Sequence, residues 1–431
     1  MKDFDTNISV LILGSGGREH ALAWKISQSN KLKKLYCSPG NPGISKYAEL
    51  ISINIENPQE VVELSKKLGI DLVVIGPETP LSLGVADELR KEGILVFGPN
   101  KSAARLEWDK SFSKDFMFRN SIPTAKSKTF SSADIDDAII YLQNHKLPVV
   151  IKASGLAAGK GVVIAQSTLE AIYTVKDMLT GSVFGEAGEV VVIEEFMTGE
   201  EASIFVITDG DNYVTLASAQ DHKRVGDGDT GLNTGGMGAY APAPIVTQSV
   251  LEKIKLDIIE PVIKGMRNEG NIYVGCLYVG LMIEDEIPRV VEFNCRFGDP
   301  ETQVVLPILD NDLLELFFHA ANCSLNPNIN VTSTGVAASV VIASIGYPGE
   351  YTKGIVITGI EKAEKLGAIV FQAGTKNEKG LLLSNGGRVL NVTAFNKNSD
   401  LNIVLETVYN AISEINFEGG FYRKDIGSKG L

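Results

Sequence analysis

The chain has 431 residues, 44% hydrophobic and 22% charged, which is the balance of a globular protein with more than one domain. Its formal net charge of -13 argues against broad binding to nucleic acid or anionic membranes. The four cysteines form no Cys-x-x-Cys pair and the four histidines are scattered, so neither a disulfide framework nor a zinc site is predicted. Met1–Asp5 lacks the pattern of a signal peptide, and no apolar run approaches the about 20 residues of a membrane span. These features predict a cytoplasmic protein.

Short apolar runs alternate with helical patterns over the first hundred residues. Val10–Leu13, Leu72–Ile75 and Ile94–Phe97 have the length of strands, and each ends in a turn rich in Gly or Pro. This alternation predicts parallel strands buried in an α/β layer. Ligands of such layers gather at the carboxyl ends of the strands, so these turns are candidates for a binding site.

The turn Gly14–His20, with the sequence Gly-Ser-Gly-Gly-Arg-Glu-His, joins the first predicted strand to a helical pattern. A dinucleotide fingerprint would have a third glycine where Glu19 stands, and would be followed by an acidic residue that Tyr36–Gly40 does not supply. This argues against an oxidoreductase. What remains is a turn whose amides and helix N-terminus can face an anion, with a tight structural turn as the alternative.

A second glycine-rich turn, Gly155–Gly161, lies between the predicted strands Val149–Ile151 and Val162–Ala165. It is not a Walker loop, because Gly161 follows the lysine and a strand follows the turn. Small residues allow phosphates to approach the backbone closely, and Lys152 at the end of the first strand can reach the same phosphates. A flexible hairpin is the alternative.

The middle of the chain continues with strands and one long connection. Val190–Ile193 is a predicted strand that runs into the acidic stretch Glu194–Glu201, where backbone could pair with adenine and a carboxylate with ribose; an ordinary acidic turn is the alternative. Residues 221–238 are expected to form a loop without structure of its own, in which Asp221 and Arg224 could grip a zwitterion. Ser249–Met266 is expected to form one helix.

The stretch Val290–Phe297 has the alternation of a strand. Glu292, Asn294 and Arg296 then share one face, and the intervening apolar residues face the core. A carboxylate and an amide oxygen two residues apart suit Mg²⁺, which keeps waters and substrate phosphates as its other ligands. A half-buried strand with a solvated polar face is the alternative. The last hundred residues indicate a smaller α+β unit.

Three motifs together indicate a known family: Gly155–Gly161, Gln220–Arg224 and Arg296–Gln303. With the turn at Gly14 they make the chain resemble the glycinamide ribonucleotide synthetase family of the ATP-grasp superfamily, over nearly its whole length. Within the matching motifs, Ser154 stands where the family has Asp, and Asp109 where it has Ser.

The resemblance implies an α/β protein (α+β in part) with the ATP-grasp fold. Its expected domains are a Rossmann-like substrate domain (1–107), an ATP-grasp domain (108–330) with a mobile lid (about 125–195), and a small α+β domain (331–431). The implied activity joins glycine to 5-phosphoribosylamine with ATP and Mg²⁺ or Mn²⁺, in a monomer or weak dimer. Two alternatives remain: another ATP-grasp carboxylate–amine ligase with a different acceptor, or a nucleotide-binding protein without catalysis.

The resemblance also implies roles for individual residues on the matching motifs. The expected catalytic residues are Lys152, Arg296 and Asp299. The expected nucleotide-binding residues are Lys110, Lys152, Ala158, Gly159, Lys160, Gly161, Glu194, Glu195, Phe196 and Glu201. The expected substrate-binding residues are Gly16, Gly17, Arg18, Glu19, Pro39, Gly40, Asn41, Asp221, Lys223, Arg224 and Arg296. The expected metal ligands are Glu292 and Asn294.

Overall fold

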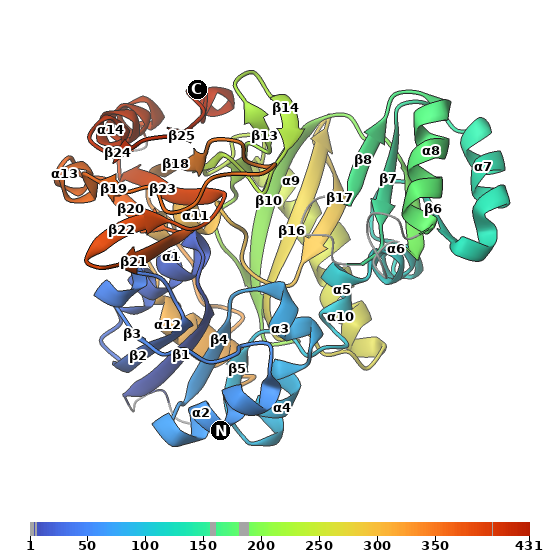
Figure 1. Ribbon diagram of the computed structural model, residues 1–431. Helices are drawn as coiled ribbons and strands as arrows, with labels where there is room; N and C mark the ends of the chain where they lie inside the picture. The colour runs from blue at the N-terminus through green and yellow to red at the C-terminus, as the bar shows by residue number, and fades with distance from the viewer. Residues whose placement is uncertain (1–3, 5–6, 156–160, 181–188, 399) are drawn as a thin grey trace.

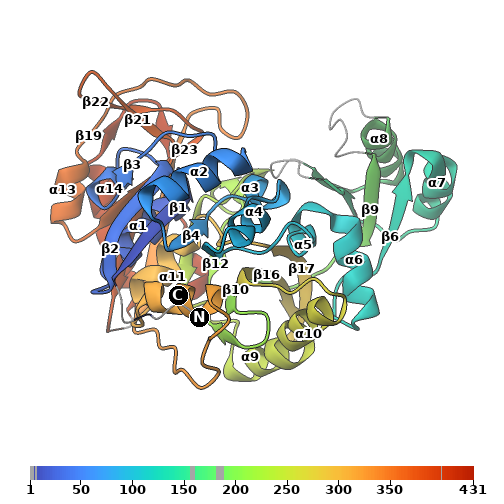
Figure 2. The ribbon, with the colours of Figure 1, turned by 90° about the horizontal axis from the view of Figure 1, so that it is seen from below.

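The computed structural model describes residues 4, 7–155, 161–180, 189–398 and 400–431. Figure 1 shows the N-terminal part (blue) beside the C-terminal part (red). A central sheet (green and yellow) separates these two parts from a smaller sheet that carries two helices. Seen from below in Figure 2, this smaller sheet stands apart from the rest of the molecule. Among the described residues, no helix has both the length and the apolar content needed to cross a membrane.

The N-terminal sheet is parallel, as the alternation of apolar runs and helices predicts. Its strand order is β3-β2-β1-β4-β5. Gly14 at the end of β1 is paired with Pro39 at the end of β2, so the turns after these strands lie side by side. The elements of this part are β1 (Ile8–Gly14), α1 (Gly17–Ile26), β2 (Leu32–Pro39), β3 (Glu49–Leu50), α2 (Pro58–Leu68), β4 (Leu72–Ile75), α3 (Glu78–Ser82), α4 (Val85–Lys91), β5 (Leu95–Phe97), α5 (Arg105–Trp108) and α6 (Lys110–Arg119).

The smaller sheet is antiparallel with strand order β6-β9-β7-β8, and its helices α7 and α8 cover one face. Ile151 and Ile193 point into the core under these helices, so the alternation of the strands turns Lys152 and Glu194 to the opposite face. The elements are β6 (Ser127–Ser131), α7 (Ile135–Gln143), β7 (Val149–Ala153), β8 (Val162–Ala165), α8 (Thr168–Leu179) and β9 (Val190–Glu195).

The central sheet is antiparallel with strand order β11-β10-β16-β17. The expected helix Ser249–Met266 is interrupted, because a π-helical turn, Lys255–Ile259, separates α9 from α10, and Pro261 stands at the start of α10. The elements are β10 (Glu200–Thr208), β11 (Tyr213–Thr215), α9 (Gln248–Ile254), α10 (Glu260–Asn268), β16 (Gly275–Glu284), β17 (Ile287–Asn294), α11 (Thr302–Ile308) and α12 (Leu313–Ala321).

The C-terminal sheet has the path β12-β15-β18-β23-β20, with β25 paired to β18. Residues 221–238 are not the unstructured loop expected from the sequence. β12 (Gln220–Asp221) and β15 (Gly238–Ala241) join this sheet, and β13 (Arg224–Gly226) and β14 (Thr230–Asn233) form a hairpin between them. The other elements are β18 (Val336–Ser344), β19 (Ile357–Thr358), α13 (Ile360–Lys365), β20 (Ile369–Gln372), β21 (Thr375–Glu378), β22 (Leu381–Ser384), β23 (Arg388–Asn396), α14 (Leu401–Ser413), β24 (Asn416–Phe417) and β25 (Gly420–Phe421).

Candidate active site

Two lysines, the buried Lys152 and the half-buried Lys110, lie where the smaller sheet meets the central sheet. Lys152 Nζ on β7 is 3.0 Å from Glu194 Oε2 and donates a 3.1 Å hydrogen bond to the carbonyl of Val291 on β17. Lys110 Nζ, at the start of α6, is 3.4 Å from the carbonyl of Gly155. Burial lowers the pKa of Lys110, and the charge of Lys152 adds to this effect while Glu292 opposes it. The structure therefore brings two expected phosphate-binding lysines together with one expected metal ligand.

Glu194 has a second lysine partner that the sequence analysis missed. Lys114 Nζ lies 3.2 Å from Glu194 Oε2 and donates a 2.8 Å hydrogen bond to Thr124 Oγ1. Burial lowers the pKa of Lys114 to about 8, although the Glu194 charge opposes the shift. Within the described part of the chain, Glu194 Oε1 is buried without a hydrogen-bond partner, so one acceptor is available to a ligand. The helical spacing of Lys110 and Lys114 was the only signal for this residue.

The remaining expected nucleotide-binding residues occupy different settings. Glu195 accepts a 3.0 Å hydrogen bond from the Lys126 backbone, Phe196 is 41% exposed, and Glu201 Oε2 lies 2.5 Å from Lys223 Nζ. Gly161 is buried, and its carbonyl accepts a 2.8 Å hydrogen bond from the Ala153 amide. Ala158, Gly159 and Lys160 lie outside the described residues.

The expected metal ligands Glu292 and Asn294 lie at the end of β17. Burial would raise the pKa of Glu292, but Lys223, Lys152 and other cations lower it below its ordinary value, so the carboxylate is ionised. Asn294 Oδ1 accepts a 3.3 Å hydrogen bond from Arg296 Nη2. An ionised carboxylate and an amide oxygen, both beside the phosphate-binding lysines, fit a hard divalent cation.

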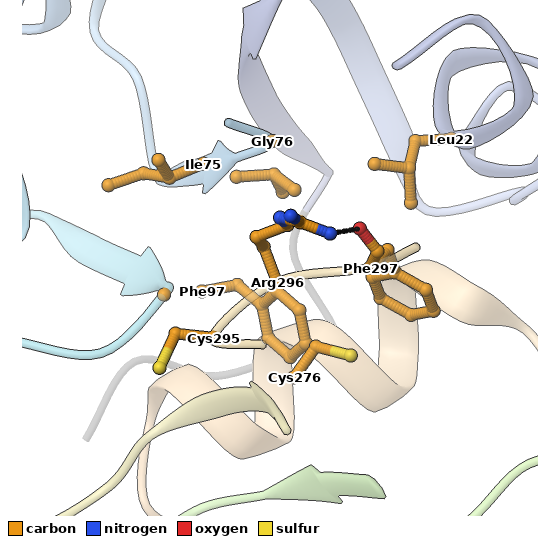
Figure 3. Close-up of a pocket in the computed structure, with 10 residues that line it drawn as sticks. Leu22, Ile75, Gly76, Phe97, Cys276, Cys295, Arg296 and Phe297 are labelled. Carbon is orange, nitrogen blue, oxygen red and sulfur yellow. Dashed lines mark hydrogen bonds between the residues drawn. The ribbon is translucent and has the colours of Figure 1, made fainter. Parts of the chain in front are cut away.

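Arg296 is held by two carboxylates from the N-terminal part of the chain. Its Nη2 lies 2.8 Å from Glu107 Oε1, and its Nε lies 3.4 Å from Glu78 Oε2. Figure 3 shows Arg296 extending past Gly76, beside the carboxyl ends of β4 and β5. Burial disfavours the guanidinium, but Glu107 and Glu78 more than compensate and raise the pKa of Arg296. Arg296 is thus a permanently charged group in a fixed place.

Glu19 fills the space inside the N-terminal glycine turn. Its Oε2 accepts a 2.6 Å hydrogen bond from the Gly16 amide, and its Oε1 accepts a 2.7 Å bond from Arg18 Nε. A Cβ atom at Gly76 would lie 2.1 Å from Glu19 Oε1, so glycine is required there. Arg18 Nη1 also donates a 2.8 Å bond to the carbonyl of Phe297, which connects the turn to the end of β17.

The turn after β2 is pinned against the first turn. Asn41 Nδ2 donates 2.8 Å hydrogen bonds to the carbonyls of Ser15 and of Gln372 on β20. The Gly40 amide donates a 3.1 Å bond to the Gly14 carbonyl. The expected substrate residues Gly16, Gly17, Arg18, Glu19, Pro39, Gly40 and Asn41 therefore lie on two adjacent turns at one edge of the N-terminal sheet.

Asp299 connects this edge to the C-terminal part through Arg388, which the sequence analysis missed. Arg388 Nη1 donates 2.6 Å and 2.7 Å hydrogen bonds to the carbonyls of Asp299 and Gly235, and lies 3.3 Å from Asp299 Oδ1. Asp299 Oδ2 accepts a 3.2 Å bond from the Arg18 amide. Burial would raise the pKa of Asp299, but Arg388 and Arg18 lower it. No local pattern marked Arg388, because its partner is 89 residues away.

Asp221 at the end of β12 and Lys223 in the link between β12 and β13 lie near the same region, since the charge of Lys223 acts on Glu292. Burial raises the pKa of Asp221 to about 7, against the opposing charge of Lys223. The Arg224 guanidinium instead donates a 2.7 Å hydrogen bond to the Gly231 carbonyl within the β13–β14 hairpin. Lys223, rather than Arg224, is therefore the cation that acts on Asp221.

A smaller antiparallel sheet beside a central antiparallel sheet, with Lys152 of β7 and Lys114 of α6 both paired with Glu194 of β9, is typical of the ATP-grasp class of fold. Models of the phosphoribosylglycinamide synthetase N domain, ATP-grasp (A) domain and C domain match residues 8–107, 108–302 and 337–429. The chain belongs to the phosphoribosylglycinamide synthetase family, as its motifs predict.

Individual relatives agree with this assignment over nearly the whole chain. Phosphoribosylamine–glycine ligase of Vibrio vulnificus is 46% identical over 427 residues, covering 98% of this chain and 99% of the relative. The ligase of the same name from Agrobacterium fabrum is 48% identical over 420 residues, covering 97% and 98%. The crystal structure of phosphoribosylamine–glycine ligase from Thermotoga maritima superposes with a TM-score of 0.85 at 32% identity, covering 97% of this chain and 100% of that one.

More distant structures share the fold alone. The biotin carboxylase domain of Hydrogenobacter thermophilus 2-oxoglutarate carboxylase, solved with MgADP, has a TM-score of 0.72 at 16% identity, covering 96% of this chain and 91% of that one. The likeness shows a shared fold, while the match to the ATP-grasp (A) domain confirms the predicted ATP-grasp architecture.

Proposed function

We propose that this protein joins glycine to 5-phosphoribosylamine with ATP, producing glycinamide ribonucleotide, ADP and phosphate. The relatives named as phosphoribosylamine–glycine ligases support this reaction. The observation that carries the proposal is the meeting of Lys110, Lys152 and the ionised Glu292 between the two sheets. A different acceptor or loss of catalysis is not favoured by the relatives or by this intact cluster.

A carboxylate does not acylate an amine directly, since oxide is a poor leaving group. The glycine carboxylate oxygen therefore attacks the γ-phosphorus of ATP, and ADP leaves. The amine of phosphoribosylamine then attacks the acyl carbon of glycyl phosphate, the carbon–oxygen bond to phosphate breaks, and the amine proton is lost. Phosphoryl transfer requires mainly positioning and neutralisation of charge, which Lys110, Lys152 and Arg296 supply.

Mg²⁺ or Mn²⁺ would be held by Glu292 and Asn294 and would neutralise the phosphate charge when bound. The nucleotide lies between the lid sheet and the central sheet, with its phosphates toward Lys110 and Lys152. Glu194 Oε1 accepts from the adenine amino group, because it is the buried acceptor without a protein partner among the described residues. Glu201 binds the ribose once its ion pair with Lys223 has opened. Lid closure protects glycyl phosphate from water.

The two amine-bearing substrates occupy opposite sides of Asp299. Phosphoribosylamine binds on the turns Gly16–Glu19 and Pro39–Asn41, whose amides and Arg18 suit an anion. Glycine binds beside Asp221, which accepts from its ammonium group, while Lys223 faces its carboxylate.

We further propose the domains 1–107, 108–330 and 331–431, a lid over about 125–195, and a cytoplasmic monomer or weak dimer.

The deciding experiment measures ADP release from Mg-ATP with glycine and freshly generated phosphoribosylamine, added separately and together. We expect release that requires both substrates, with glycinamide ribonucleotide as the product. Release without phosphoribosylamine would assign a different acceptor. Binding of ATP without ADP release in any combination would contradict the ligase. Replacing Mg²⁺ by Mn²⁺ in the same assay compares the two metals.

A further inference from the structure

The C-terminal segment, Tyr422–Leu431, holds the outer side of the β13–β14 hairpin. Its second residue, Arg423, is 1% exposed. Arg423 Nε and Nη2 bind the two carboxylate oxygens of Asp425 at 2.8 Å and 2.7 Å. Its Nη1 donates to Asp229 Oδ1 at 2.9 Å and to the Arg224 carbonyl at 3.0 Å. One guanidinium therefore connects the C-terminal segment to the first residue of β13 and to the turn of the hairpin.

Further bonds attach the hairpin turn to the same segment. The Lys424 amide donates 2.8 Å to Asp227 Oδ1, and the Gly228 amide donates 2.8 Å to Asp425 Oδ2. Lys429 Nζ lies 2.7 Å from Asp229 Oδ2. The segment itself is anchored on α14, where the Tyr409 hydroxyl donates to the Arg423 carbonyl at 3.2 Å.

The segment also reaches His222, in the link between β12 and β13 at the proposed glycine site. The Gly427 amide donates a 3.1 Å hydrogen bond to His222 Nε2, and the His222 side chain is buried. Burial lowers the pKa of His222 to about 4, so the ring is neutral and its nitrogen can accept. His222 stands between Asp221 and Lys223, in the two-residue link between β12 and β13. The His222 ring contacts the C-terminal segment, whereas the Lys223 side chain pairs with Glu201.

We propose that Tyr422–Leu431 is a positioning element for the glycine subsite, acting through Arg423 on the hairpin and through Gly427 on His222. The inference rests on the proposed function, because it assigns glycine to Asp221 and Lys223. Binding sites tolerate only displacements well below 1 Å. A loosened hairpin therefore lowers productive glycine binding, although every group that contacts glycine is still present. Residues more than 190 positions away in the sequence thereby determine the placement of the link that contains Lys223.

The test compares Arg423→Met and Asp229→Asn with the control Lys424→Met. Asp229 is 39% exposed, so its replacement disturbs the clamp with less risk to folding than the loss of buried Arg423. Lys424→Met removes a positive charge from the same segment, but the exposed side chain takes no part in the clamp and its backbone bond to Asp227 remains. Steady-state KM values for glycine and for ATP and the thermal midpoint are measured for each protein.

We expect both clamp variants to raise the KM for glycine about tenfold, as the loss of one charge-assisted hydrogen bond would. The KM for ATP should change by less than about threefold, and Lys424→Met should behave as wild type. A folded clamp variant with unchanged KM for glycine, or with equal rises for both substrates, would overturn the inference. If instead the wild-type protein released ADP without any need for glycine, the proposed function itself would fail. The wild-type assay shows this before any variant is made, so the two failures are distinguished.

Discussion

The hydroxyl of Ser154, on the residue that follows lid strand β7, lies 3.3 Å from Oδ1 of Asp109, the N-cap of α6. Ser154 and Asp109, where the motif resemblance implies Asp and Ser in the family, are therefore in contact, so the two residue types stand exchanged relative to that expected pattern. Asp109 Oδ1 also caps the Phe112 amide at 3.0 Å, and its Oδ2 lies 2.8 Å from Arg105. The added negative charge is thus used in a helix cap and an ion pair rather than directed at the phosphates.

This exchange predicts non-additive stability in a double-mutant cycle. Ser154→Asp alone places two carboxylates together and should reduce the free energy of unfolding by roughly 1–3 kcal/mol. Asp109→Ser alone keeps a capping residue and should cost less than about 1 kcal/mol. The double variant should recover most of the Ser154→Asp loss. Urea unfolding of the four proteins measures the coupling, and strictly additive effects would contradict the exchange.

Lys152 should be essential for turnover while contributing less to folding. Lys152→Met is expected to lower kcat/KM for ATP about 10²–10³-fold, because a charge facing the transferred phosphoryl group is removed. Glu194 keeps Lys114 as a partner in this variant, so the protein should still fold. Lys176→Met, on the exposed side of α8, is the matched lid control. Near-normal turnover of Lys152→Met would remove this residue from the mechanism.

Lys114 predicts a stability that depends on pH. Burial lowers its folded-state pKa to about 8, below the ordinary value of 10.5, so between these values the unfolded chain binds more protons than the folded one. Stability contributed by this residue therefore rises with pH through that window, by roughly 2 kcal/mol from pH about 8 to about 10. The difference in unfolding free energy between wild type and Lys114→Met, measured at both ends, should show this rise. A difference that falls or stays constant would contradict the shifted pKa.

Arg296 depends on Glu107 for its position. Glu107 Oε1 pairs with Arg296, while its Oε2 accepts a 2.7 Å hydrogen bond from the Cys295 amide. Glu107→Gln leaves a buried guanidinium short of a partner and should cost about 3 kcal/mol of stability, with a large fall in kcat. Glu78→Gln is the matched control, since Glu78 is 34% exposed and its contact is longer, and should cost less than about 1 kcal/mol. Equal losses in both variants would show that Glu107 has no special role.

The sequence by itself determined the local features of this protein. Apolar runs ended by Gly or Pro located β1, β4 and β5, because a buried parallel strand is apolar throughout and must then turn. Alternation placed Glu292 and Asn294 on one face of β17. The motifs determined the family, and with it the ATP-grasp fold. The exposed β13–β14 hairpin escaped this reasoning, because its polar strands carry no apolar pattern.

Only the tertiary structure decided how the charged groups are paired. Lys114 shares Glu194 with Lys152, Arg296 is held by Glu107, and Arg388 comes from the C-terminal sheet to Asp299. The Arg423 clamp belongs to the same class. Such pairs join residues tens to hundreds of positions apart, and any carboxylate in a chain is a possible partner for any cation. Packing of the sheets selects the partners of each buried charge, because a buried charge left unpaired is costly, and that selection leaves no trace in the local sequence.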